Sequence, residues 1–240
     1  MDKKYGVFVT SAVNATFSKY DPQERLVQTL TTLASVQKHI PNAVICLAES
    51  SVPGVDDETK KILSAQVHNM IDLSKDTTIN WVHQNITHQD TVKNMSELIL
   101  TTKFFKVARK QGWFNECDRI FKISGRYNLN DNFDLSKYHD ESLKDKFVFK
   151  KKMLSQFGYN LTKQSLQHPT RLYSFDASLL DFYIETLEKM TNDMQEITND
   201  NRYIDIEHLV CKFIPNNKKV EFGRLGIEGN IAPHKTFIED

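Results

Sequence analysis

The chain contains little glycine, proline or cysteine, and it has no excess charge of either sign. Its 240 residues include 8 Gly and 6 Pro, too few for a collagen-like or linker-rich architecture. The 31 basic and 31 acidic residues cancel, which excludes a uniformly basic nucleic-acid coat but allows a local basic patch. No apolar run approaches the roughly 20 residues that cross a bilayer, and the N-terminal residues lack the apolar core of a signal peptide. We therefore expect a cytoplasmic protein with no membrane partner.

Familiar metal, redox and nucleotide motifs are also missing. Cys46, Cys117 and Cys211 lie far apart, in or beside apolar stretches, and their spacing is not that of a zinc site. They are predicted to be buried free thiols. There is no GxxxxGK[ST], no GxGxxG after the first predicted strand, no GxSxG and no HExxH. His83 and His88 are predicted to be surface histidines rather than metal ligands.

The order of hydrophobic patterns predicts an α/β fold. Short β-rich apolar runs predict strands over 5–13, 43–48, 79–84, 119–124, 146–152, 171–175 and 220–225. Apolar residues at three- and four-residue spacing predict helices over 21–40, 56–70, 96–109, 176–187 and 204–214. Because strands and helices alternate in the first half, we expect right-handed crossovers and a mixed, mostly parallel sheet flanked by helices. No linker or repeat interrupts the chain, which predicts one domain over 1–240.

Polar residues follow three of the predicted strands, where an open α/β sheet binds its ligands. They are Thr10, Ser11 and Asn14 after the first, Glu49, Ser50 and Ser51 after the second, and Gly125, Arg126 and Tyr127 after the fourth. This set suits a nucleotide, with Glu49 on ribose hydroxyls or a base edge and Arg126 on phosphate. The competing interpretation is that these are ordinary polar loop residues.

Several stretches, in order along nearly the whole chain, resemble GT-A-fold glycosyltransferases. The KISGR run at 122–126 lies where this family has K-I-(D/S)-x-(D/R) before its sugar-nucleotide site. VTSAVNATFSKYDPQERLVQTL is similar to the family's first strand and helix, and AVICLAESS to its second strand. The tail stretches IDIEHLV and RLGIEGNIAP resemble small viral and bacterial members. The resemblance implies a GT-A-like, Rossmann-related fold with a nucleotide-sugar-binding half at 1–125 and an acceptor-side half at 126–240.

The chain departs from the common family pattern at one strand end. Most GT-A enzymes carry Asp-x-Asp there to hold a divalent ion against the diphosphate, whereas this chain has Ser124-Gly125-Arg126. A guanidinium can neutralise a leaving diphosphate, and strand alternation places Lys122 on the same face as a second cation. The alternative is that Asp131 or Asp134 recruits Mn²⁺ or Mg²⁺. No cofactor is therefore assigned firmly, and no metal ligand is chosen.

An inverting transferase needs a carboxylate to accept the proton of the acceptor hydroxyl. The resemblance places such a base at the start of a late helix, which indicates Glu207 first and Asp205 second. Both acids can equally be charges that favour a helix start, and a retaining mechanism needs neither. The stretch Lys93-Asn94-Met95-Ser96-Glu97 also resembles a family stretch that faces the donor phosphates, which directs Lys93 toward them. For Ser96 we favour the alternative that it is only a helix cap.

The densest basic run is Lys150, Lys151 and Lys152, with Phe157 and Tyr159 nearby. It is either a solvated face or an acceptor surface for a phosphate backbone.

The resemblance implies a hexosyl- or pentosyltransferase that uses a nucleoside-diphosphate sugar, with UDP expected. The acceptor is either a hydroxymethylated base of phage DNA, in the host cytoplasm, or a surface glycan. The alternative class is a non-catalytic sugar-nucleotide or nucleic-acid binding module of the same fold, and the oligomeric state stays open.

Overall fold

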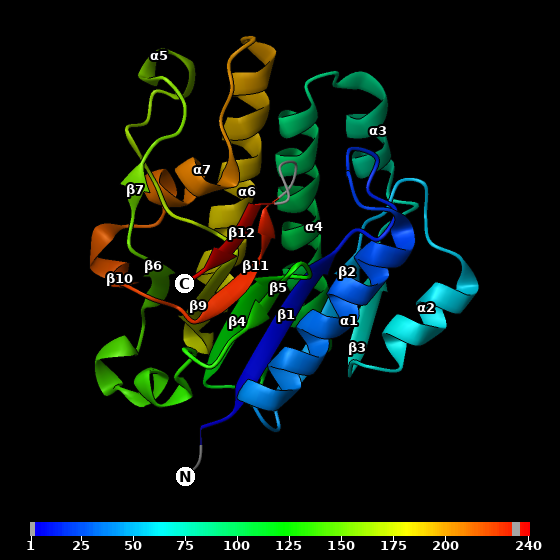
Figure 1. The fold of residues 1–240 in the computed structure, drawn as a ribbon. Coiled ribbons are helices and arrows are strands. Elements are labelled where there is room, and N and C mark those ends of the chain that lie inside the picture. The colour runs from blue at the N-terminus through cyan, green and yellow to red at the C-terminus, as the bar shows by residue number, and fades with distance from the viewer. Residues whose placement is uncertain (1–2, 232–235) are drawn as a thin grey trace.

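A computed structural model describes residues 3–231 and 236–240, and its centre is a seven-stranded sheet (Figure 1). The strand order is β10-β6-β9-β4-β1-β2-β3. These strands are β1 (Tyr5–Ser11), β2 (Val44–Glu49), β3 (Asn69–Asp72), β4 (Arg119–Ser124), β6 (Phe147–Lys150), β9 (Leu172–Asp176) and β10 (Lys219–Phe222). β9 pairs antiparallel with both of its neighbours, and the other pairs in this sheet are parallel. The predicted mostly parallel α/β sheet is confirmed.

Helices cover both faces of this sheet. They are α1 (Pro22–His39), α2 (Asp57–Ser64), α3 (Thr77–Asn85), α4 (Gln89–Gln111), α5 (Tyr159–Thr162), α6 (Leu180–Asn199) and α7 (Ile206–Phe213). Short 3₁₀ helices are η1 (Leu135–His139), η2 (Glu141–Leu143), η3 (Ala177–Leu179) and η4 (Asn216–Lys218). In Figure 1, α1 crosses one face of the sheet, and α4 and α6 run along the other.

Two smaller sheets accompany the central one. β5 (Tyr127–Leu129), β11 (Ile227–Ile231) and β12 (Thr236–Glu239) form an antiparallel sheet, and β7 (Met153–Leu154) pairs with β8 (Leu166–Gln167). The three-stranded sheet packs beside α1 through β5. Ala232 and Pro233, at the end of the RLGIEGNIAP stretch, lie outside the described residues.

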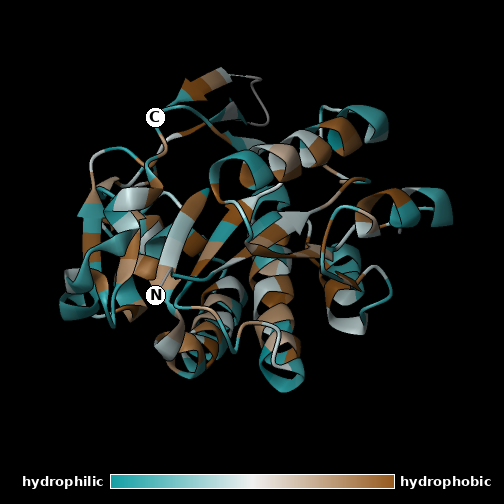
Figure 2. Cartoon of the chain, turned by 90° about the horizontal axis from the view of Figure 1, so that it is seen from below, coloured by the Kyte–Doolittle hydropathy of each residue, from teal (hydrophilic) through white to brown (hydrophobic). Residues whose placement is uncertain are grey.

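The central strands alternate their side chains between two hydrophobic layers. Phe8 of β1 points to the α4 side, where its ring stacks on Phe104 at 3.7 Å between centroids. Val7 and Val9 point to the α1 side and pack with Leu33. Burial on both faces explains why this strand is a continuous apolar run. Hydrophilic residues gather at the outer ends of the helices (Figure 2).

Local sequence signals set the ends of two helices. Asp21 caps α1 by accepting a hydrogen bond from the Glu24 amide, Glu24 reaches back to the Asp21 amide, and Pro22 opens the helix. Gly112 ends α4 in the left-handed conformation, with φ of 70°.

One expected strand is wrong. Residues 79–84 belong to α3, because Asp76 caps a helix there by accepting from the Thr78 and Ile79 amides. Ile79 and Val82, three residues apart, form its buried face. The strand is β3 instead, so the helix predicted over 56–70 ends at Ser64. β11 and β12 were not predicted.

The cysteines are free among the described residues. Cys46 and Cys117 are buried, as expected, and Cys211 is half-buried. Burial raises the pKa of the Cys46 thiol to about 12, which leaves it protonated and unreactive at neutral pH. In the described part of the chain, no helix combines the length and apolar character needed to span a membrane.

Candidate functional site

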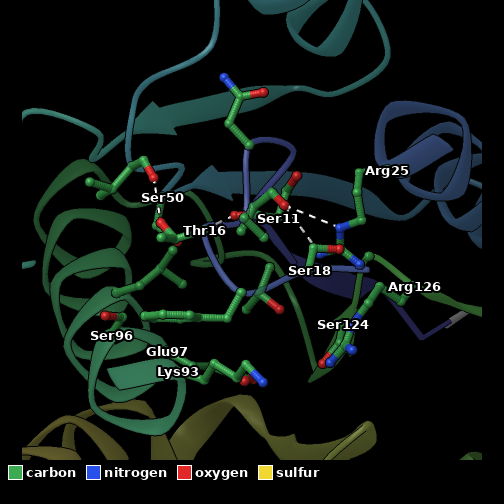
Figure 3. A pocket seen from close by; sticks show the side chains of 18 of the residues that line it. Ser11, Thr16, Ser18, Arg25, Ser50, Lys93, Ser96, Glu97, Ser124 and Arg126 are labelled. Carbon is green, nitrogen blue, oxygen red and sulfur yellow. Dashed lines mark hydrogen bonds between the residues drawn. The ribbon is translucent and has the colours of Figure 1, made fainter. Parts of the chain in front are cut away.

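A cavity of about 280 Å³ lies where β1 and β4 end, beside the first turns of α4 (Figure 3). It is lined by most of the predicted donor-binding residues, namely Thr10, Ser11, Asn14, Lys93, Ser124, Gly125 and Arg126. Residues that were not predicted complete its wall, among them Phe17, Arg25, His83, Asn94 and Glu97.

The strand register brings these residues to one edge of the sheet. Thr10 lies opposite Ser124, and Ser11 lies opposite Glu49. The Gly125 amide donates to the Thr10 carbonyl at 2.8 Å, and a Cβ on Gly125 would lie 2.8 Å from the same oxygen. Only glycine permits this approach, which turns the chain along the end of β1 and directs Arg126 to the cavity.

Two arginines lie at one end of the cavity, away from the α4 residues Lys93, Ser96 and Glu97 (Figure 3). Arg25, in the first turn of α1, is nine-tenths buried and donates through Nε and Nη2 to the Ala12 carbonyl at 3.2 Å. Burial, and then the charge of Arg126, lower the pKa of Arg25 to about 10. Arg25 still carries its charge at neutral pH, so the two guanidiniums repel each other and favour an anion between them.

Lys122 lies beneath the cavity rather than in its lining. Its Nζ donates to Glu97 Oε1 at 2.5 Å, to Ser124 Oγ at 2.9 Å and to the Thr170 carbonyl at 3.2 Å. All three of its protons are therefore used by the protein, and the side chain is 2% exposed. Lys122 holds α4, β4 and the segment before β9 together, so it positions cavity residues instead of facing a ligand.

Glu97 is the partner of that lysine in the cavity wall. Burial alone would raise its pKa, but Lys122 and then Arg126 outweigh burial and lower the pKa of this carboxyl. Glu97 is therefore ionised at neutral pH. Its Oε1 contacts Lys122, and the carboxylate presents acceptor capacity to the cavity.

Glu49 lies behind the cavity wall and is fully buried. Its carboxylate accepts hydrogen bonds from Ser11 Oγ at 2.6 Å and from the Ser51 amide at 2.8 Å, and it also contacts the Ser51 hydroxyl. The charge of Glu49 is therefore used to tie the ends of β1 and β2 together. Glu49 is not among the residues that line the cavity.

Ser96 is not a helix cap. α4 begins seven residues earlier, at Gln89, and His88 caps it by accepting from the Thr91 amide. Ser96 lines the cavity at 7% exposure, and among the described residues its Oγ has no hydrogen-bond partner. Because buried hydroxyls in proteins are nearly always paired, this oxygen points to a ligand in the cavity.

Asp205 and Glu207 differ in what they contact. Asp205 caps α7, accepting from the His208 amide at 3.0 Å, and its Oδ1 lies 2.6 Å from His208 Nδ1. Glu207 accepts from Gln167 Nε2 at 2.6 Å and from the Thr170 amide at 3.3 Å. Burial, and then Asp205, raise the pKa of Glu207. Neither acid is part of the cavity lining, and Thr170 connects Glu207 to Lys122 through its peptide N–H and carbonyl groups.

The predicted acceptor lysines lie away from this cavity. Lys150 pairs with Asp240 at 2.7 Å, and Lys152 with Glu221 at 3.5 Å. Lys151 and Tyr159 are exposed. Phe157 packs on Tyr203, with ring centroids 4.7 Å apart.

The residues at the strand end do not fit a divalent cation. Ser124 and Gly125 with the guanidinium of Arg126 stand where carboxylates would be needed. Asp131, the alternative, pairs with Lys38 at 2.9 Å, and Asp134 accepts from the Ser136 amide; neither lines the cavity. Within residues 3–231 and 236–240, no three His, Cys, Asp or Glu side chains gather as a metal site would require.

Arg25 and Glu97 were not among the residues predicted from sequence. Arg25 shares the inward face of α1 with Thr29, Thr32 and Leu33, so a charged residue on an otherwise buried helix face was the available signal. Glu97 lies in the 93–97 stretch that resembles the family, but nothing local singled it out, because its partner Lys122 lies on a distant strand.

No protein-family model matches the chain, and no curated protein matches it. Solved structures do match. Core-mannan synthase A from Aspergillus fumigatus, in its Mn/GDP form, has a TM-score of 0.57 and 10% identity, over 97% of this chain and 75% of that one. The galactosyltransferase LgtC, in complex with donor and acceptor sugar analogs, has a TM-score of 0.51 and 12% identity, over 86% of this chain and 70% of that one. Mouse xyloside xylosyltransferase 1 has a TM-score of 0.54 and 10% identity, over 91% of this chain and 85% of that one.

These structural neighbours are GT-A-fold glycosyltransferases, and the chain has the same mixed α/β fold. The expected GT-A-like architecture is therefore confirmed.

The buried Lys122–Glu97 pair predicts a stability effect. Lys122→Met leaves a partly buried carboxylate without its cation and should lower the free energy of unfolding by about 2–4 kcal/mol in denaturant titrations at pH 7. Because the folded pKa of Glu97 is lowered, its contribution is present above the unfolded pKa of about 4.3 and is lost as pH falls through the folded pKa. The double variant Lys122→Met/Glu97→Gln should regain part of the loss. A single variant within about 0.5 kcal/mol of wild type would contradict this role.

Proposed function

We propose that the chain is a glycosyltransferase that moves a sugar from a nucleoside-diphosphate donor to an acceptor hydroxyl. The pair of guanidiniums at the strand-end cavity, Arg25 and Arg126, carries this proposal. A diphosphate bound between them relieves the repulsion between the two guanidiniums. Their electrostatic stabilisation of the diphosphate increases as its negative charge grows during departure from the sugar.

The rest of the cavity suits the other parts of such a donor. Ser96 and Glu97 present hydroxyl and carboxylate groups to sugar hydroxyls, whereas the Asn94 side-chain NH2 donates to the Asp90 carbonyl and the Tyr203 hydroxyl. Phe17 and His83 line the cavity with nearly parallel rings, 6.3 Å apart at an angle of 8°, which can contact a planar base. We take uridine as the base, as the family resemblance implies.

Glu207 is the proposed base for the acceptor hydroxyl. Its raised pKa, caused by burial and then by Asp205, makes it a better proton acceptor than an ordinary carboxylate. Asp205 is engaged as the cap of α7 and supports Glu207 electrostatically.

The acceptor is proposed to be a glycan hydroxyl rather than a hydroxymethylated base of phage DNA. A DNA acceptor would use free lysines and a stacking ring, whereas Lys150 and Lys152 have carboxylate partners and Phe157 packs on Tyr203. Lys151, Lys163 and Tyr159 remain exposed, and two lysines offer few contacts to a phosphate backbone.

Arg126→Ala tests the proposal directly. Losing a charge aimed at the leaving diphosphate should raise the barrier by about 2–4 kcal/mol, roughly 30- to 1000-fold in kcat, with unchanged thermal unfolding. Turnover is measured as nucleotide release from a UDP-sugar. Arg109→Ala removes an exposed guanidinium that pairs with Asp181 on α6, and it should leave turnover unchanged. Sugar nucleotides that stabilise the fold but are never cleaved would identify a binding module instead.

Chelation separates the guanidinium site from a metal site. One structural neighbour was solved with manganese and GDP, but the residues at this strand end do not fit a divalent ion. Transfer by the wild-type chain should therefore persist in EDTA. Loss of activity in EDTA with recovery on adding Mn²⁺ would show that a metal carries the diphosphate.

Glu207→Gln keeps the shape of the side chain but removes the proton acceptor. We expect kcat to fall by about 10²–10⁴ with donor affinity unchanged. Because the pKa of Glu207 is raised, wild-type activity should fall as pH decreases at a value above the usual carboxyl range near 4.3, and the variant should lose that limb. Equal losses of kcat and donor affinity, or a larger effect of Asp205→Asn, would contradict the assignment.

A further inference from the structure

A hairpin on the acceptor side concentrates exposed apolar side chains. We call residues 151–167, which contain β7, α5 and β8, the 151–167 hairpin. It holds five of the ten large hydrophobic side chains that are exposed in the described structure, although it makes up a small part of the chain. They are Met153, Leu154, Tyr159, Leu161 and Leu166, with Leu154 at 75% and Tyr159 at 59% exposure. Such a concentration marks an interaction surface.

Strand pairing directs two of these side chains outward together. Leu154 lies directly opposite Leu166 in the β7–β8 register. The neighbouring pair, Met153 and Gln167, occupies the other face, and Gln167 is buried against Glu207. The two leucines therefore form a cross-strand apolar pair that faces away from the protein.

The body of the protein holds the hairpin in place. Gln167 donates to Glu207 at 2.6 Å, Ser155 Oγ lies 2.8 Å from His208 Nε2, and Phe157 packs on Tyr203. In Figure 1, β7 and α5 project beyond the central sheet, beside one end of α6. The leucines are thus presented at the end of a fixed projection.

The hairpin lies in a stretch of one charge sign. From residue 146 to 175 the sequence has five Lys, one Arg and no Asp or Glu, in a chain whose 31 basic and 31 acidic residues cancel overall. Lys151 and Lys163 are exposed, and no ion pair involves either within the described ranges. Lys163 lies over the Tyr159 ring at 5.8 Å.

We propose that the 151–167 hairpin binds the surface of a lipid bilayer that contains anionic headgroups. Leu154, Leu161 and Leu166 enter the boundary between headgroups and acyl chains, and Lys151 and Lys163 pair with lipid phosphates. Tyr159 suits the same boundary, because its ring is apolar and its hydroxyl is polar. Binding of this kind needs no membrane-spanning segment. It goes beyond the proposed transferase activity and does not depend on it.

The aliphatic character of the exposed side chains favours a lipid partner over a nucleic acid. Four of the five exposed side chains are aliphatic. Contact with a phosphate backbone does not stabilise an aliphatic side chain, whereas transfer from water into the boundary of a bilayer is favourable because of the hydrophobic effect. The combination of aliphatic residues with unpaired lysines fits anionic lipid.

Vesicle sedimentation tests the proposal without any sugar nucleotide, so its outcome is independent of the transferase activity. The full chain is mixed with vesicles of phosphatidylcholine alone or with added phosphatidylglycerol. We expect binding to the anionic vesicles that weakens with salt. Leu154→Ser/Leu166→Ser should weaken it about tenfold or more, and Lys151→Gln/Lys163→Gln should weaken binding to anionic vesicles specifically. Phe237→Ser, which changes a residue 58% exposed on β12, is the matched control and should bind as wild type does.

Three results would overturn the proposal. The first is no binding of the wild-type chain to either vesicle, and the second is equal weakening by the Phe237→Ser control. The third is that the leucine variant abolishes self-association in sedimentation velocity, or DNA binding at low salt, while vesicle binding is unchanged. Thermal unfolding of each variant confirms that the fold is retained. If the leucine variant does not fold, the lysine variant decides the question.

Discussion

The buried ammonium of Lys122 is the interaction on which the arrangement of the site depends. It lies on β4, at the centre of the sheet, and its three protons go to Glu97 of α4, to Ser124 at the strand end and to the Thr170 carbonyl. A cation at 2% exposure is tolerated only when its partners are fixed, so these three elements are held in one geometry. Through the Thr170 peptide the same lysine also sets the position of Glu207.

Cations line the cavity at more than one place. The guanidiniums of Arg25 and Arg126 occupy one end, and the α4 side contributes the Lys93 ammonium beside the Ser96 hydroxyl and the Glu97 carboxylate. Glu49 is nearby but is occupied with the backbone and hydroxyls of the β1 and β2 loops. A ligand with an anionic end and a hydroxyl-rich end complements this distribution better than a uniformly charged one.

The elements that the sequence predicted correctly are those with strong local signals. Asp21, Pro22 and Glu24 set the start of α1, and the apolar runs of β1 and β4 identify strands that are buried on both faces. The spacing of Ile79 and Val82 is too short a pattern to separate a nine-residue helix from a strand, and β11 contains Gly229 and Asn230, which disfavour strand formation.

The strand-end residues were predicted to meet because parallel strands end at one edge. Sequence could not show that Lys122 and Glu49 lie below the cavity surface, because depth depends on packing between elements that are distant in the chain.

The guanidinium pair has a consequence for the end of the proposed reaction. In that reaction the Arg25–Arg126 pair is proposed to contact the diphosphate whether or not a sugar is attached. We then expect the two side chains that assist formation of the nucleoside diphosphate to hold it after release as well, so the proposal implies product inhibition and slow departure of the nucleotide.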